Sequence, residues 1–354
     1  MKSQVMKIGI YARQIDHFIE TVASLLAWDG RFQVTLVISG EPFPQTEHFW
    51  SVRRLAGAGR VRIIDWHGEP EQWDALWLYL PTIPKEERKR MRRWASRAGE
   101  IGLLSPELYD VTWKRHLKEA IKSVRYLARA RRALVQAASS SIHPYLPLRH
   151  TGFYAIYVHP QFFNQPELLA TFREVVQKRK DSRRYTFAFI GNRQPESRER
   201  ALQAMRREFA EKEYDLQEST DRLPRSDSLA VLWIEYGPEG AVRGLKPDDF
   251  LATLEEVEFC FCPFGWSRFS HRVVEALAAG SIPILEGEAS YNRGLRDGVN
   301  CLVVENGDWV KTVRRAQAMP AAQRQEIREN VYKLRAAQLT PELAALDCVR
   351  RLGW

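Results

Sequence analysis

The chain has 354 residues, of which 45% are hydrophobic and 27% charged, a composition of ordinary globular proteins and enough length for two domains. This excludes a disordered chain, and no apolar run approaches the ~20 residues of a transmembrane helix. The net charge is +9 and lies entirely in residues 1–160, which hold 24 Lys and Arg against 15 Asp and Glu, whereas residues 161–354 hold 29 of each.

The first 160 residues alternate apolar strand patterns with helical ones, as in a doubly wound parallel sheet. We expect strands at residues 6–11, 33–38, 61–64, 74–80, 101–104 and 134–137, and helices at residues 18–27, 86–97 and 114–131.

The loop after the first strand holds a carboxylate and an imidazole, Asp16 and His17. In an open α/β sheet, ligands bind beyond the carboxyl ends of the strands, so this loop is the first place to seek a catalytic base. Asp16 can instead cap the following helix, and a single histidine is most often an ordinary surface residue. Glu107 and Asp110, after a later strand, are a second candidate pair.

Two predicted helices of this half, within residues 85–97 and 114–132, hold most of its basic side chains. Such runs are often solvated helix faces. The alternative is a surface that binds an anion.

A second α/β unit begins after a segment rich in proline and aromatic residues, 143–166, which we expect to cross between domains. Its first strand, YTFAFIGN, ends at Gly191 and Asn192, and Arg193 follows. Backbone amides after Gly191 and the Arg193 guanidinium are suited to a diphosphate. A helix with Arg198 and Arg200 comes next, and further strands are expected at residues 230–235, 259–261, 282–285 and 301–304. Residues 217–228 are polar and loop-like.

Residues 259–285, FCFCPFGWSRFSHRVVEALAAGSIPIL, predict a buried strand, a loop opened by Gly265, and a helix with Ser270 at its N-cap. The amides of the first helical turn favour phosphate. Arg272 lies in that turn, where a cation opposes the helix dipole, which suggests that it answers a bound anion. Glu275 is suited to accept hydrogen bonds from ribose hydroxyls. His271 can donate to a phosphate or simply pack in the loop. Any α/β protein contains capped helices with a stray arginine, so the structural alternative stays open.

The ordered pattern C-x-C-P-x-G, S-x-R-x-x-E-A and A-G-x-I-P-I resembles the C-terminal signature of exostosin-like glycosyltransferases over about thirty residues. More loosely, the YTFAFIGN strand and YNRGLRDGVNCLVVE at residues 291–305 are similar to nucleotide-sugar transferases of the GT-B fold. Many retaining GT-B enzymes have a second glutamate eight positions before the one that matches Glu275. Here that position is Ser267. Exostosin-like enzymes also lack that acid, so the departure favours that branch and, by resemblance, implies inversion at the anomeric carbon.

The resemblance implies a GT-B fold, an α/β architecture of two Rossmann-like domains that face a central cleft. Residues 1–160 would be the basic, acceptor-binding domain and residues 161–335 the domain that binds the nucleotide-sugar donor. A C-terminal helix, residues 336–354, would pack on the N-terminal domain, because the last helix of many GT-B proteins crosses back.

The implied function is transfer of a sugar, with a UDP-sugar as the expected co-substrate and no cofactor. The acceptor hydroxyl would belong to an anionic molecule such as a surface polysaccharide or a lipid-linked glycan. No convincing D-x-D motif for a metal appears; Asp248 and Asp249 precede a helix and are expected to cap it. We therefore expect metal-independent transfer. Two alternatives remain, a DNA-modifying glycosyltransferase that acts on a hydroxylated base and a non-catalytic nucleotide-binding protein.

The four cysteines, Cys260, Cys262, Cys301 and Cys348, have no metal-site spacing and are expected to be reduced core residues. With no signal peptide apparent, the expected location is cytoplasmic, either free or peripheral at the inner face of the membrane, where anionic lipids attract basic residues.

Overall fold

The computed structural model describes residues 5–12, 15, 17–40, 55–79, 87–105, 130–135, 150–153, 157, 159, 161–193, 196–210, 214–217, 229–236, 245–265, 270–286 and 294–354. It contains two compact units. The first consists of residues 1–155, 159–164 and 341–354, and the second of residues 156–158 and 165–340.

The first unit is built on a sheet of seven parallel strands in the order β3-β2-β1-β4-β5-β6-β7. The strands are β1 (Met6–Ala12), β2 (Phe32–Ile38), β3 (Val61–Asp65), β4 (Trp73–Tyr79), β5 (Ala98–Ser105), β6 (Ala130–Val135) and β7 (His150–Phe153). Its described helices are α1 (His17–Trp28), α3 (Arg88–Ser96), α5 (Gln161–Asn164) and α12 (Pro341–Arg351).

Tryptophans dominate the core of this unit beneath α3. The Trp94 ring of α3 stacks on Trp66 and on Trp73, with centroids 5.3 Å and 4.8 Å apart. Because an all-parallel sheet must be covered on both faces, its strands read as nearly continuous apolar runs. The chain returns to this unit at its end: α12 packs against α1, and the Trp354 ring lies 5.3 Å from that of Phe32.

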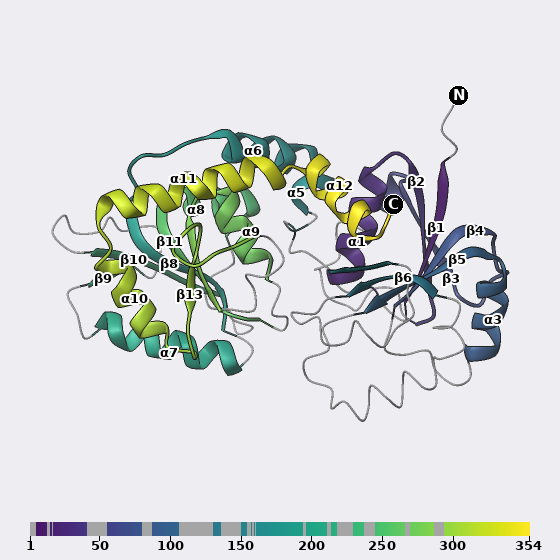
Figure 1. The fold of residues 1–354 in the computed structure, drawn as a ribbon, viewed down its shortest axis with the longest axis horizontal. Coiled ribbons are helices and arrows are strands. Elements are labelled where there is room, and N and C mark those ends of the chain that lie inside the picture. Colours follow the sequence, from purple (N-terminus) through teal and green to yellow (C-terminus); the bar gives the residue numbers. More distant parts are fainter. Residues whose placement is uncertain are drawn as a thin grey trace. The chain divides into compact units, whose positions relative to one another are not determined.

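The second unit has six parallel strands in the order β13-β12-β11-β8-β10-β9. They are β8 (Tyr185–Asn192), β9 (Tyr214–Gln217), β10 (Leu229–Tyr236), β11 (Val257–Cys262), β12 (Ile282–Glu286) and β13 (Leu302–Val304). Its helices are α6 (Pro166–Gln177), α7 (Glu196–Ala210), α8 (Pro247–Glu255), α9 (His271–Ala278), α10 (Trp309–Gln317) and α11 (Ala321–Gln338). Figure 1 shows α7 and α10 on one face of this sheet and α6, α8, α9 and α11 on the other.

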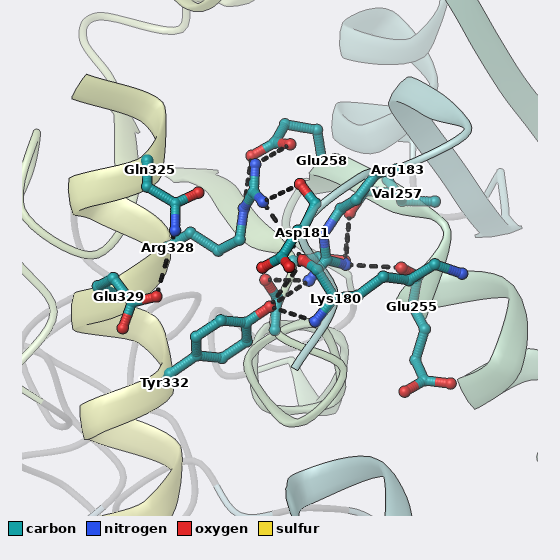
Figure 2. A network of polar contacts seen from close by, with 12 residues as sticks. Lys180, Asp181, Arg183, Glu255, Val257, Glu258, Gln325, Arg328, Glu329 and Tyr332 are labelled. Carbon is teal, nitrogen blue, oxygen red and sulfur yellow. Dashed lines mark hydrogen bonds and ion pairs between the residues drawn. The ribbon is translucent and has the colours of Figure 1, made fainter. Parts of the chain in front are cut away.

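A polar network ties α11 to the amino-terminal ends of β8 and β11 (Figure 2). Arg328 of α11 forms a buried ion pair with Glu258, with Nη2 2.6 Å from Oε2, and its Nη1 donates to the Asp181 carbonyl at 2.8 Å. Arg183 donates to carbonyls at the C-terminal ends of α8 and α9, among them Glu255 and Gly280. Cations at helix C-termini complement the helix dipoles, so this network stabilises the side of the unit where the strands have their amino-terminal ends.

Several elements differ from the sequence-based predictions. The helix expected at residues 114–131 does not include its last two residues, because β6 begins at Ala130, and residues 114–129 lie outside the described residues. The short strands β7 and β9 and helix α6 were not predicted. Asp248 and Asp249 do not cap α8: the N-cap is Lys246, since Pro247 already occupies the first helical turn. The four cysteines are free and buried.

Candidate functional site

The topology of the second sheet marks where a ligand is expected. The chain places β9 and β10 on one side of β8, and β11 to β13 on the other. The winding therefore reverses between β8 and β11, and open α/β sheets bind ligands at such switch points, beyond the carboxyl ends of the strands. Gly191 and Asn192 end β8, and Gly265 lies three residues after the end of β11.

Helix α9 begins beside this switch point. The Oγ of Ser270, the predicted N-cap, accepts a hydrogen bond from the Arg272 amide at 3.2 Å. The helix forms because apolar residues recur on its packed side, where Val273, Val274 and Leu277 are fully buried. Amides of the first helical turn lack partners within the helix, so this end is suited to an anion.

Arg272 is held firmly but is incompletely paired. Its guanidinium carbon lies 4.2 Å from the centroid of the Phe250 ring, and Nη2 is 3.8 Å from where a Cβ on Gly191 would stand. Its Nη1 is buried and has no hydrogen-bond acceptor among the described residues. The Glu275 carboxylate is 3.7 Å away, beyond ordinary hydrogen-bond length. A buried donor without an acceptor is costly, and an anionic ligand would supply one.

Glu275, one turn further along α9, is only 7% exposed. Burial raises the pKa of this carboxyl, and the charge of Arg272 opposes that rise without cancelling it. A carboxylate kept in so dry a position costs stability, so its presence beside Arg272 is more easily explained by a ligand than by packing.

Arg198 of α7 reaches the same place and was not among the predicted site residues. Its guanidinium joins the end of β8 to the loop after β11, with donors to Asn192 Oδ1 at 2.8 Å and to the Phe264 carbonyl at 2.9 Å. Burial, and then the charge of Arg272, lower its pKa to about 10. The sequence feature that pointed to Arg272 also applies to Arg198, because each is a cation in the first turn of a helix, where it opposes the helix dipole.

Two other predicted donor-site residues have protein partners. Arg193 pairs with Glu199 at 3.0 Å and with Glu235 at 3.4 Å. His271 Nδ1 lies 2.5 Å from the carbonyl of Tyr157. A carbonyl only accepts, so Nδ1 carries the proton, and Nε2 can donate to a phosphate only when the ring is protonated.

The predicted catalytic residues Asp16, Glu107 and Asp110 lie outside the described residues, and His17 begins α1 without a described side chain. Ser267, which replaces the second acid of many retaining enzymes, lies outside the described residues as well.

The first sheet has its own switch point between β1 and β4, and a carboxylate lies near it. Tyr11, on β1, donates its hydroxyl to the carboxylate of Glu87, the residue before α3, and is 3.1 Å from the hydroxyl of Ser39, which follows β2. Sequence patterns gave no hint of this pair, because the two residues are far apart along the chain.

In the described residues, no three or more His, Cys, Asp or Glu side chains gather as a metal site would require. No helix in that part of the chain is both long and apolar enough to cross a membrane.

Comparisons with known proteins agree with the predicted family and fold. Residues 134–294 match the model of the exostosin GT47 domain, which confirms the predicted resemblance. No curated protein sequence matches the chain.

Solved structures confirm the GT-B fold at low sequence identity. A glycosyltransferase from Rickettsia africae is 9% identical, with a TM-score of 0.59, and the match covers 98% of this chain and 97% of that one. HepE from Anabaena, solved with UDP and glucose, is 10% identical, with a TM-score of 0.57 and coverage of 98% and 99%. α,α-Trehalose 6-phosphate synthase from Burkholderia multivorans is 11% identical, with a TM-score of 0.57 and coverage of 99% and 96%.

Proposed function

We propose that this chain, with its match to the exostosin GT47 domain, is a glycosyltransferase that moves a sugar from a UDP-sugar to a hydroxyl of an anionic acceptor. The observation that carries the proposal is the state of Arg272. At a topological switch point and a helix N-terminus, its buried Nη1 has no hydrogen-bond acceptor among the described residues. That HepE, a protein of similar fold, binds UDP supports the choice of nucleotide.

Each predicted donor-site residue has a proposed role. The α9 amides beyond Ser270 and the Arg272 guanidinium hold the diphosphate. The Glu275 carboxylate accepts hydrogen bonds from the ribose hydroxyls. Gly191 and Gly265 let the nucleotide approach the backbone, and we keep Asn192, Arg193 and His271 as further contacts at the rim of the site.

The reaction would invert the anomeric carbon. A base in the N-terminal unit takes the proton of the acceptor hydroxyl, and that oxygen attacks the anomeric carbon as the bond to the diphosphate breaks on the opposite face. We keep Asp16 and His17 as the proposed base. Arg272 and the helix amides would neutralise the leaving UDP without a metal. Activity that disappears with a chelator and returns with manganese would contradict that part.

The acceptor is proposed to be anionic and bound by residues 1–160, with the donor bound by residues 161–335. Lys89, Arg92 and Arg93 on the outer side of α3 are exposed and form no ion pair among the described residues. Unneutralised cations on one helix face attract a phosphorylated or acidic glycan, including one attached to lipid at a membrane surface.

Titration calorimetry with UDP tests the proposal directly. The wild-type protein should bind UDP, and Arg272→Ala should weaken binding by roughly a hundredfold, because one charge-assisted bidentate contact is lost in a poorly solvated site. Arg200→Ala, an exposed arginine of α7, is the matched control and should bind normally.

Three results would change the conclusion. A wild-type protein that binds no nucleoside diphosphate would refute the donor site. Tight binding of a UDP-sugar that is never transferred or hydrolysed would favour a non-catalytic nucleotide-binding protein. A salt-sensitive complex with DNA, together with transfer to a hydroxylated base, would favour the DNA-modifying alternative.

A further inference from the structure

Arg198 connects two loops that the proposed nucleotide must touch. Its Nη1 donates to the carbonyl and side-chain oxygen of Asn192 at 3.3 Å and 2.8 Å, at the end of β8. On the other side, Nη2 and Nε donate to the carbonyls of Pro263 and Phe264 at 3.2 Å and 2.9 Å, just after β11. The four bonds span the switch point where the winding of the sheet reverses.

The shape of the β11 loop depends on the same side chain. A Cβ placed on Gly265 would lie 2.6 Å from Arg198 Nη2, well inside contact distance. A larger residue at position 265 would therefore displace the guanidinium from its present hydrogen bonds, so the glycine of the C-x-C-P-x-G pattern permits the observed position of Arg198.

The charge of Arg198 is not neutralised by its partners. All four acceptors are neutral oxygens, and Arg198 forms no ion pair within the described part of the chain. Arg272 is close enough to lower the pKa of Arg198 further, after burial. Two guanidinium groups thus lie near one another. The Glu275 carboxylate is 3.7 Å from Arg272, and the Glu286 carboxylate, which accepts a hydrogen bond from the Phe264 amide, acts on Arg198 through its charge. An anion with several charges would stabilise such a pair of guanidinium groups.

We propose that Arg198 is a positioning residue of the donor site, which holds the β8 and β11 loops together and supplies a positive charge, without an ion-pair partner among the described residues, that favours a nucleoside diphosphate over a monophosphate. This inference rests on the proposed function. It goes further by assigning the choice between one and two phosphates to a residue on α7, which precedes residues 259–285 and their exostosin-like motifs but lies within the matched domain.

Two substitutions separate the two parts of the proposal. Asn192→Asp is nearly isosteric, so it keeps an acceptor for Arg198 but places a neutralising carboxylate beside it. Arg198→Lys keeps the charge but cannot span both loops, because an ammonium lacks the planar fork.

For Asn192→Asp we expect roughly tenfold weaker UDP binding and a smaller loss for UMP, as a site that has lost net positive charge discriminates less by phosphate charge. For Arg198→Lys we expect UDP and UMP binding to weaken together. Hydrogen exchange at residues 191–193 and 262–265 should become faster in this variant, and it should stay unchanged in Asn192→Asp. Gly265→Ala should resemble Arg198→Lys, because its Cβ displaces the guanidinium without removing the charge.

Calorimetry with UDP and UMP, together with melting temperatures of the ligand-free proteins, decides the matter, and Arg200→Lys serves as the control on the same helix. The inference is overturned if Arg198→Lys and Asn192→Asp both bind UDP within twofold of wild type. It is equally overturned if every variant only lowers the melting temperature and leaves the UDP-to-UMP affinity ratio unchanged. A wild-type protein that binds neither nucleotide would refute the proposed function instead.

Discussion

At the scale of single residues, the site is assembled from groups that are unfavourable without a ligand. Arg272 opposes the dipole of α9, and Glu275 is a buried carboxyl whose ionised form is destabilised. Neither residue is needed to form the helix. Ser270 caps it, and its apolar side packs in the core. Functional sites often retain such costs, because the groups that bind a ligand must stay unsatisfied until it arrives.

Glu275 makes UDP affinity depend on pH in a defined direction. Its pKa is raised by burial, so the carboxyl takes up a proton at a higher pH than a free glutamate does. As the pH falls through that raised pKa, the acceptor for the ribose hydroxyls is lost and UDP affinity should decrease. The diphosphate also titrates, so the useful quantity is the affinity of wild type divided by that of Glu275→Gln at each pH.

That ratio should be roughly three to ten at neutral pH and should fall towards one in acid, since glutamine does not titrate. The folding stability of the ligand-free protein should depend on pH in the opposite direction, because the buried carboxyl is more favourable when it is protonated. A raised carboxyl pKa contributes stability below the pKa and loses it above, so Glu275→Gln should be no less stable than wild type at neutral pH. A ratio that is independent of pH would exclude the ribose role.

At the scale of elements, the sequence predicted best where local and tertiary preferences agree. The strand Val257–Cys262 and the helix His271–Ala278 were expected within two residues, because a fully buried strand, a serine cap and a periodic apolar face all indicate the same structure. The short strands β7 and β9 were missed, since four residues carry too little pattern. Arg198 was missed as a site residue because the sequence does not show that it bridges to the β11 loop, where its partners Pro263 and Phe264 lie 65 and 66 residues away.

The α11 network should matter for stability rather than for binding. Arg328→Ala would leave Glu258 buried without its partner, and breaking a buried ion pair costs about 3–5 kcal/mol. Urea unfolding of the second unit should show this loss. The exposed pair of Lys311 and Glu305 is the matched control, and Lys311→Ala should cost less than ~1 kcal/mol.

A second comparison tests whether the pair itself stabilises the unit. Replacing both Arg328 and Glu258 by methionine removes the charges together and should recover most of the lost stability, because desolvation offsets much of the attraction in a buried pair. An Arg328→Ala protein as stable as wild type would show that α11 is held by its apolar face alone.

At the scale of the whole molecule, charge and chemistry divide between the two units. The net charge of +9 belongs to residues 1–160, whereas the two buried arginines proposed to serve the diphosphate, Arg198 and Arg272, lie on α7 and α9 of the second unit. The charge difference between the two halves could be counted in the sequence. The catalytic residues could not be identified in the same way, because Asp16 and the rest of the loop after β1 have no distinctive pattern. In a protein organised in this way, substitutions of the catalytic base should reduce turnover without changing the affinity for the donor.

We therefore expect Asp16→Asn and His17→Gln, alone and combined, to bind UDP with wild-type affinity, because the diphosphate site lies in the other unit. Transfer from a panel of UDP-sugars to a phosphorylated or acidic glycan should fall by roughly 10²–10⁴ in the variant that removes the base. Glu87→Gln is the comparison, since Glu87 is the described carboxylate that Tyr11 orients near the switch point of the first sheet. If the Asp16 and His17 variants keep full activity while Glu87→Gln loses it, the base belongs to Glu87. Loss of UDP binding in the Asp16 or His17 variants would instead contradict the division of labour between the units.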